Sequence, residues 1–146
     1  MFRMNRILGS IIPFVILAAF VLAACGGTPV SKNPVDIQIT VTEFNITSSL
    51  ATFSVGVPYH FVVTNKGSAP HELLIMPVAT EQMTADQIQA LKASALDGIT
   101  GDNLTAGATQ SMTYTFTKAY PAGVLEFACY FPGHYEAGMK LPIVVN

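Results

Sequence analysis

The chain has 146 residues, of which 51% are hydrophobic and only 11% are charged, and its formal net charge is −2 at pH 7. Two of its seven basic residues, Arg3 and Arg6, lie at the extreme N-terminus, so the remainder is mildly acidic and has no basic cluster. This charge distribution argues against nucleic acid as a partner. The length corresponds to one domain, large enough to bury a core without disulfide bonds.

Residues 1–24 are predicted to be an export signal that takes no part in the fold. Arg3 and Arg6 precede an almost wholly apolar run that ends in Leu22-Ala23-Ala24, directly before Cys25. This pattern resembles the lipobox of bacterial lipoproteins, in which the cysteine becomes the first mature residue and carries the lipid. The alternatives are a plain secretory signal and an uncleaved membrane anchor. All three predict that the rest of the chain lies outside the cytoplasm, in the periplasm or on the outer face of a membrane.

Residues 25–34 are rich in Gly, Pro and Ser and are predicted to be a tether between a lipidated Cys25 and a domain of residues 35–146. Within this domain, apolar and polar residues alternate in short runs, which is typical of half-buried antiparallel strands. The runs are residues 37–41, 59–63, 71–75, 112–116, 125–129 and 139–145. Turns are expected at residues 65–67 and 120–123.

One stretch has helical periodicity instead. Three apolar residues recur at helical spacing within residues 84–96, and Thr84 with Gln87 forms a capping box. Gly98 and Gly101 are expected to end the helix. The sequence therefore predicts an all-β, two-sheet sandwich with one short helical insertion.

Four side chains form a candidate metal site. Strand parity places His71, Cys129 and Met139 on core-facing sides, and His134 lies in the short loop between the last two strands. Two imidazoles, a thiol and a thioether suit copper, whereas zinc is disfavoured because no carboxylate or second cysteine completes a closed tetrahedron. His71 comes from a distant strand and is expected to link the two sheets through the metal. Taken singly, each residue could instead be an ordinary strand histidine, core methionine or inert buried thiol.

Residues 65–71 (NKGSAPH) and 129–139 (CYFPGHYEAGM) resemble the ligand segments of the cupredoxin family, the blue or type 1 copper proteins. The loop spacing resembles auracyanins and rusticyanin more than plastocyanins. The resemblance implies a Greek-key β-sandwich and one mononuclear type 1 copper. Its equatorial ligands would be His71, Cys129 and His134, and Met139 the long axial ligand. Glu72 departs from the asparagine that many cupredoxins carry after this histidine, which leaves the hydrogen bonding to the cysteine sulfur open.

A ligand set with no open position predicts electron transfer and not an enzyme, with no small-molecule substrate. Redox proteins are the expected partners, docking on an apolar ring around His134. The ring is predicted to comprise Phe131, Pro132, Tyr135 and Ala137. The alternatives are a copper storage or delivery protein and a copper-carrying accessory subunit of a respiratory enzyme. His60, which alternates out of phase with its apolar neighbours, is predicted to lie on the surface.

Overall fold

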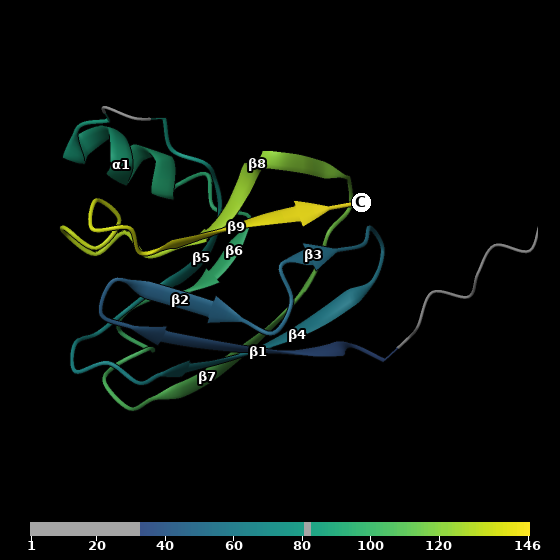
Figure 1. Cartoon of the computed structure of the whole chain (residues 1–146), viewed down its shortest axis with the longest axis horizontal. Helices are drawn as coiled ribbons and strands as arrows, with labels where there is room; N and C mark the ends of the chain where they lie inside the picture. The colour runs from purple at the N-terminus through teal and green to yellow at the C-terminus, as the bar shows by residue number, and fades with distance from the viewer. Residues whose placement is uncertain (1–32, 81–82) are drawn as a thin grey trace, which may run out of the picture.

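The computed structural model of this protein describes residues 33–80 and 83–146 (Figure 1). The predicted export signal, and Cys25 with its predicted lipid, lie outside these residues and remain predictions. Among the described residues, no helix is long and apolar enough to cross a membrane.

The described residues form two packed β-sheets, as predicted (Figure 1). The four-stranded sheet has the order β2-β1-β4-β7, and the five-stranded sheet the order β3-β9-β8-β5-β6. The first consists of β1 (Val35–Thr42), β2 (Asn45–Ser48), β4 (Pro58–Asn65) and β7 (Thr109–Thr115). The second consists of β3 (Thr52–Phe53), β5 (Leu73–Pro77), β6 (Asp97–Ile99), β8 (Tyr120–Ala128) and β9 (Lys140–Val145). Two pairs, β1 with β4 and β3 with β9, are parallel, and the other pairs are antiparallel.

The core lies between the two sheets because alternate residues of each strand face inward. An aromatic cluster fills its centre. The Phe53 ring contacts those of Tyr59, Phe61, Phe116 and Phe127, with centroid separations from 4.9 to 5.9 Å. All five side chains are buried, so the short strand β3 is anchored by one large side chain.

The predicted helix is present as α1 (Ala85–Lys92), and its capping box is formed by Thr84 and Gln87. It ends earlier than expected, with Ala93 as its C-cap. Gly98 lies instead in β6, where an added Cβ would be 2.5 Å from Leu74 Cδ2. The glycine therefore serves close packing against β5 and does not end the helix.

Helix α1 lies over the outer face of the five-stranded sheet (Figure 1). A second, smaller apolar cluster joins the two. Its buried members are Leu74, Met76, Ile88, Ala128, Tyr130 and Tyr135. Both faces of the strand pair β5 and β8 are thus covered, one by the main core and the other by the helix and loop.

The sequence prediction of a turn at residues 120–123 is wrong. These residues belong to β8, whose pairing with β9 is irregular between Tyr120 and Leu125. Gly123 adopts φ 82° within this irregularity, a conformation that favours glycine. Pro121 and Gly123 therefore mark an irregularity within one strand and not a turn between two strands.

The aromatic cluster yields a stability prediction. Phe53→Ala should lower the free energy of unfolding by about 3–5 kcal/mol, because it opens a cavity that four surrounding rings cannot fill. Denaturant unfolding measures this change. The matched control is Val55→Ala at a site 39% exposed, which should change the free energy by less than about 0.5 kcal/mol. Equal effects for both variants would contradict a core centred on Phe53.

Candidate metal centre

Three strand ends of one sheet meet at the site. Antiparallel pairing of β5 with β8, and of β8 with β9, brings the start of β5, the end of β8 and the start of β9 together. His71 precedes β5, Cys129 follows β8, and Met139 precedes β9. The expectation that His71 links the two sheets is therefore wrong, because β5 and β8 are neighbours in the five-stranded sheet.

The side chains of His71, Cys129 and His134 converge on one point. Each offers one ligand atom, and the three atoms lie within 4.8 Å of one another. The two imidazole Nδ1 atoms are 3.3 Å apart, and Cys129 Sγ lies 3.4 Å from His134 Nδ1. His71 and Cys129 are fully buried, and His134 is half-buried.

This geometry fits a single small metal ion. Three N and S ligands with bonds of roughly 2.0–2.3 Å around one ion are separated by roughly 3.5 Å in a trigonal arrangement. The observed nitrogen–nitrogen and sulfur–nitrogen separations of 3.3 and 3.4 Å match that spacing. Two imidazoles and one thiol are also the donor set of a type 1 copper site.

Buried Asn65 holds the loop that leads to His71. Its amide nitrogen donates hydrogen bonds to the carbonyl oxygens of Ala69 (2.8 Å) and Leu104 (3.0 Å). Its amide oxygen accepts one from the backbone N–H of Gly67 (2.8 Å). The His71 backbone N–H donates to the same Leu104 carbonyl. The sequence identified Asn65 only as a turn residue, because its distant partner cannot be seen in local sequence.

Gly67 leaves room for the His71 ring. A Cβ at residue 67 would lie 2.7 Å from His71 Nε2 and 2.8 Å from Glu43 Oε1, closer than side-chain atoms normally approach. Any larger residue would push the imidazole away from the other ligands.

Backbone hydrogen bonds close the loop that carries His134. The His134 N–H donates to the Phe131 carbonyl at 2.9 Å, and the Met139 N–H donates to the His134 carbonyl at 3.0 Å. The Cys129 N–H donates to the Met139 carbonyl at 3.2 Å. The loop therefore has little freedom to reorient its histidine.

Two further sequence predictions concern Met139 and His60. Met139 is fully buried in the main core at the start of β9, and its role as the axial ligand remains a prediction. His60 is about one-third exposed, and its Nδ1 lies 2.8 Å from Asp36 Oδ1, on the pair of strands β1 and β4. It belongs to the surface, as predicted.

The environment of Cys129 keeps its thiol neutral when no metal is bound. Burial raises the pKa of the thiol, and the backbone N–H of Glu72 partly opposes this by donating to Sγ at 3.3 Å. Burial and the neighbouring His134 lower the pKa of His71. The hydrogen bond to sulfur that the sequence left open at Glu72 is thus supplied by the main chain.

The predicted apolar ring around His134 needs one correction. Tyr135 is not part of it, because its ring is buried and stacks on Tyr130 at 4.7 Å, and its hydroxyl donates to Glu126 at 2.6 Å. Phe44 takes its place. This residue is half exposed, has φ 60°, and packs edge-on against His134 with a centroid separation of 5.5 Å.

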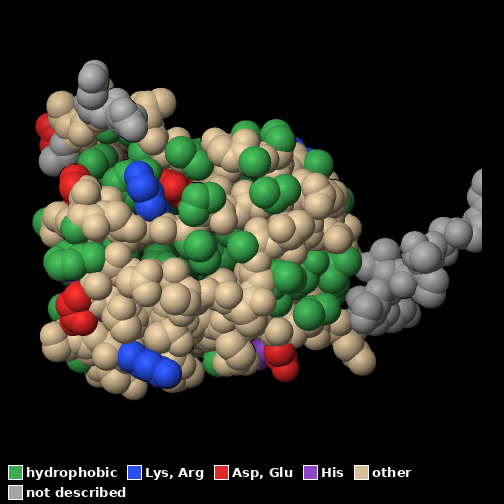
Figure 2. All heavy atoms as spheres, in the orientation of Figure 1, with side chains coloured by type: hydrophobic (Ala, Val, Ile, Leu, Met, Phe, Trp, Pro, Cys, Tyr) green, Lys and Arg blue, Asp and Glu red, His purple; other side chains and the backbone are tan. Residues whose placement is uncertain are grey.

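Phe131 also contacts this half-buried ligand, with its ring centroid 5.7 Å from that of His134. No local sequence pattern identifies Phe44, because the β1–β2 turn approaches the ligand loop only in the folded sandwich. Charged side chains of the described residues are few and scattered on the face drawn in Figure 2.

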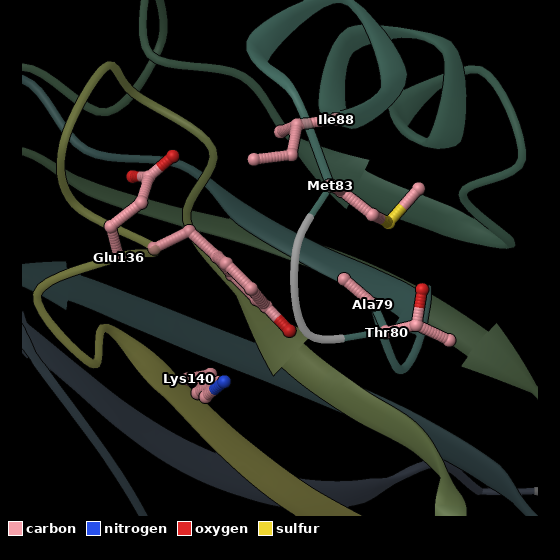
Figure 3. Close-up of a pocket in the computed structure, with 7 residues that line it drawn as sticks. Ala79, Thr80, Met83, Ile88, Glu136 and Lys140 are labelled. Atoms are coloured by element: carbon pink, nitrogen blue, oxygen red, sulfur yellow. The ribbon is translucent and has the colours of Figure 1, made fainter.

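A cavity lies beside this centre and not at it. It has a volume of about 250 Å³ and lies between the helix and the loop that carries His134 (Figure 3). Met83 and Ile88 line it from the helix side, Glu136 from the loop and Lys140 from β9 (Figure 3). None of His71, Cys129 and His134 lines it.

Comparison with known proteins agrees with this geometry. The sequence profile of a family described as copper binding proteins, plastocyanin/azurin family, matches residues 33–146. The copper-resistant cuproprotein CopI of Rubrivivax gelatinosus is 35% identical over 91 residues, which are 62% of this chain and 53% of that protein. The chain thus spans about half the length of this curated relative.

Two solved structures share the fold. Auracyanin B has a TM-score of 0.58 and 19% identity, over 80% of this chain and 93% of its own. The reduced auracyanin of Roseiflexus castenholzii has a TM-score of 0.56 and 18% identity, over 78% of this chain and 98% of its own. These likenesses confirm the predicted cupredoxin-like sandwich.

The neutral thiol leads to a prediction about pH. Because the pKa of Cys129 is raised and that of His71 is lowered, metal binding near pH 7–8 should displace the thiol proton. Anaerobic Cu(I) affinity should therefore rise by about tenfold per pH unit in this range, measured by competition with a Cu(I) chelator. In Cys129→Ser the affinity should fall and this slope should disappear. A pH-independent affinity of the unaltered protein would contradict the thiol as a ligand.

Proposed function

Because the chain belongs to the copper-binding proteins of the plastocyanin/azurin family, we propose that it is a type 1 copper electron-transfer protein. His71, Cys129 and His134 are the equatorial ligands, and Met139 is the axial ligand. The observation that carries this proposal is the convergence of one nitrogen from each imidazole and the Cys129 Sγ within 4.8 Å. Copper bound by such a set supplies one-electron chemistry.

The way the ligands are held favours electron transfer over catalysis. Asn65 fixes the approach to His71, and main-chain hydrogen bonds close the loop around His134. A rigid ligand frame keeps structural change between oxidation states small, as an electron carrier requires. The cavity between the helix and the His134 loop is not lined by these three ligands, so it offers a substrate no direct approach to the metal.

The fold also favours access of partner proteins to the end of the sandwich that carries the proposed copper ligands. β1 starts at Val35 and runs parallel to β4, whose end at Asn65 leads to the His71 loop. The domain therefore begins at the end of the sandwich opposite the ligands (Figure 1). If residues 25–34 tether the domain outside the cytoplasm through a lipid on Cys25, His134 points away from the membrane and toward redox proteins.

Copper handling is the second candidate function, and the CopI relative supports it. That protein is described as a copper-resistant cuproprotein, and copper resistance is a reason to weigh copper storage or delivery against redox cycling for this chain. The two functions differ in one measurable property. A carrier retains its copper through repeated oxidation and reduction, whereas a delivery protein releases it.

Copper loading and redox cycling test the proposal. Adding Cu(II) to the purified protein should produce an intense visible thiolate-to-copper band at one copper per chain. The band should disappear and return fully through repeated reduction and reoxidation in the presence of a copper chelator. Cys129→Ser should lack the band, whereas Met83→Leu, beside the cavity, should keep it. Progressive loss of the band on cycling would favour copper delivery, and its absence from the unaltered protein would exclude type 1 copper.

The surface around His134 gives a prediction about partners. Ala137→Lys and Phe44→Lys should each slow electron exchange with a redox partner by roughly tenfold, because a charge disrupts a small apolar contact surface. The visible band should stay unchanged. Val124→Lys, at an exposed apolar residue in the middle of β8 and outside the ring around His134, is the control. Stopped-flow kinetics measures the rates, and equal rates in all variants would place the docking surface elsewhere.

A further inference from the structure

Beside the candidate copper site lies a partly buried ion pair between Glu72 and Lys92. We propose that this pair sets the reduction potential of the site, with Lys92 acting as a positioning residue that neutralises a carboxylate next to the cysteine sulfur. The inference rests on the proposed copper function. It means that a residue of the inserted helix, Lys92, influences the reduction potential although the helix supplies no copper ligand.

Glu72 is in direct contact with two of the ligands. It follows His71 in the chain, and its backbone N–H donates to Cys129 Sγ at 3.3 Å. The Glu72 side chain pairs with Lys92 of α1 and lines a small cavity with Gln89 of the same helix, so it lies on the side of the sheet that the helix covers. The Glu72 side chain is only 5% exposed.

Lys92 is the ion-pair partner of this carboxylate among the described residues. It lies in the last turn of α1, and its Nζ donates to Glu72 Oε1. The other carboxylate oxygen, Oε2, is buried and has no hydrogen-bond partner in the part of the chain described. A carboxylate in this setting depends on one ammonium group for its compensation, because burial has removed most of its hydration.

Both charges act on the copper ligand. The Glu72 backbone N–H contacts Cys129 Sγ at 3.3 Å, and the Glu72 carboxylate is paired with the Lys92 ammonium, so both charges lie close to the sulfur. Reduction adds one electron to the site, so a nearby negative charge disfavours the reduced form and a nearby positive charge favours it. The Glu72 carboxylate therefore lowers the reduction potential and the Lys92 ammonium raises it. Removing one of the two charges should shift the potential in the direction that the remaining charge favours.

The alternative is that the pair only anchors α1 on the sheet. Ile88 of the helix already belongs to one buried apolar cluster with Leu74 and Met76 of the sheet, so an anchoring role for the ion pair predicts changes in stability alone. An electrostatic role predicts potential shifts of opposite sign for the two partners, which loss of anchoring would not produce.

Four variants of the copper-loaded protein separate these roles, with the reduction potential measured at pH 8 and low salt. Lys92→Gln should lower the reduction potential. At a constant applied potential, the ratio of Cu(II) to Cu(I) should rise by roughly threefold to tenfold. This modest shift is expected because the Lys92 side chain is 31% exposed and water screens part of its charge. Glu72→Gln should raise the potential, the double variant should lie between the two single variants, and Lys92→Arg should restore the original value.

Lys118→Gln is the matched control. It removes the same charge near Tyr120, at the opposite end of β8 from Cys129, and should leave the potential unchanged. Thermal unfolding of every variant measures anchoring separately. Shifts of the same sign in Lys92→Gln and Glu72→Gln, or no shift in Lys92→Gln, would overturn the inference.

The outcome also separates this inference from the proposed function. If the unaltered protein shows no thiolate-to-copper band, the proposed function fails and the potentials have no type 1 site to report on. If the band is present and the potential does not respond to Lys92, only the role of the ion pair fails.

Discussion

The candidate copper site depends on the pairing of β8 with its two neighbours. Because β5 and β9 both run antiparallel to β8, the start of each lies beside its end. That register places His71, Cys129 and Met139 at one end of one sheet, and the loop between β8 and β9 adds His134. A shift of one residue in either pairing would turn a ligand to the other face of the sheet, so the hydrophobic alternation that fixes the core also fixes the ligand set.

Hydrogen bonds to the main chain complete what the strand register begins. Asn65 connects the His71 loop to Leu104, and the Glu72 N–H reaches the sulfur of Cys129. These groups belong to segments far apart in the chain. They hold the ligand atoms at metal-binding distances while satisfying buried polar groups that would otherwise destabilise the fold.

The outer face of the five-stranded sheet is a second region with a bearing on function. There α1 and the loop around His134 pack over β5 and β8, and Tyr130 and Tyr135 stack beside the buried carboxylate of Glu126. Burial raises the pKa of Glu126, which matches a site with little water. The Glu72–Lys92 pair lies on this same face, so the helical insertion brings a charge close to the metal ligands as well as covering a strand pair.

The sequence by itself determined the sandwich, the capped helix and the identity of three side chains that meet. These features follow from local patterns: period-two alternation, the Thr84 capping box and the short spacing of Cys129 and His134. Local patterns can be recognised without knowing the order of the strands. Tertiary structure alone decided that β5 lies next to β8, that Tyr135 turns inward while Phe44 covers His134, and that Lys92 reaches Glu72. Each of these depends on which distant segments become neighbours, and that choice follows from the packing of the whole core.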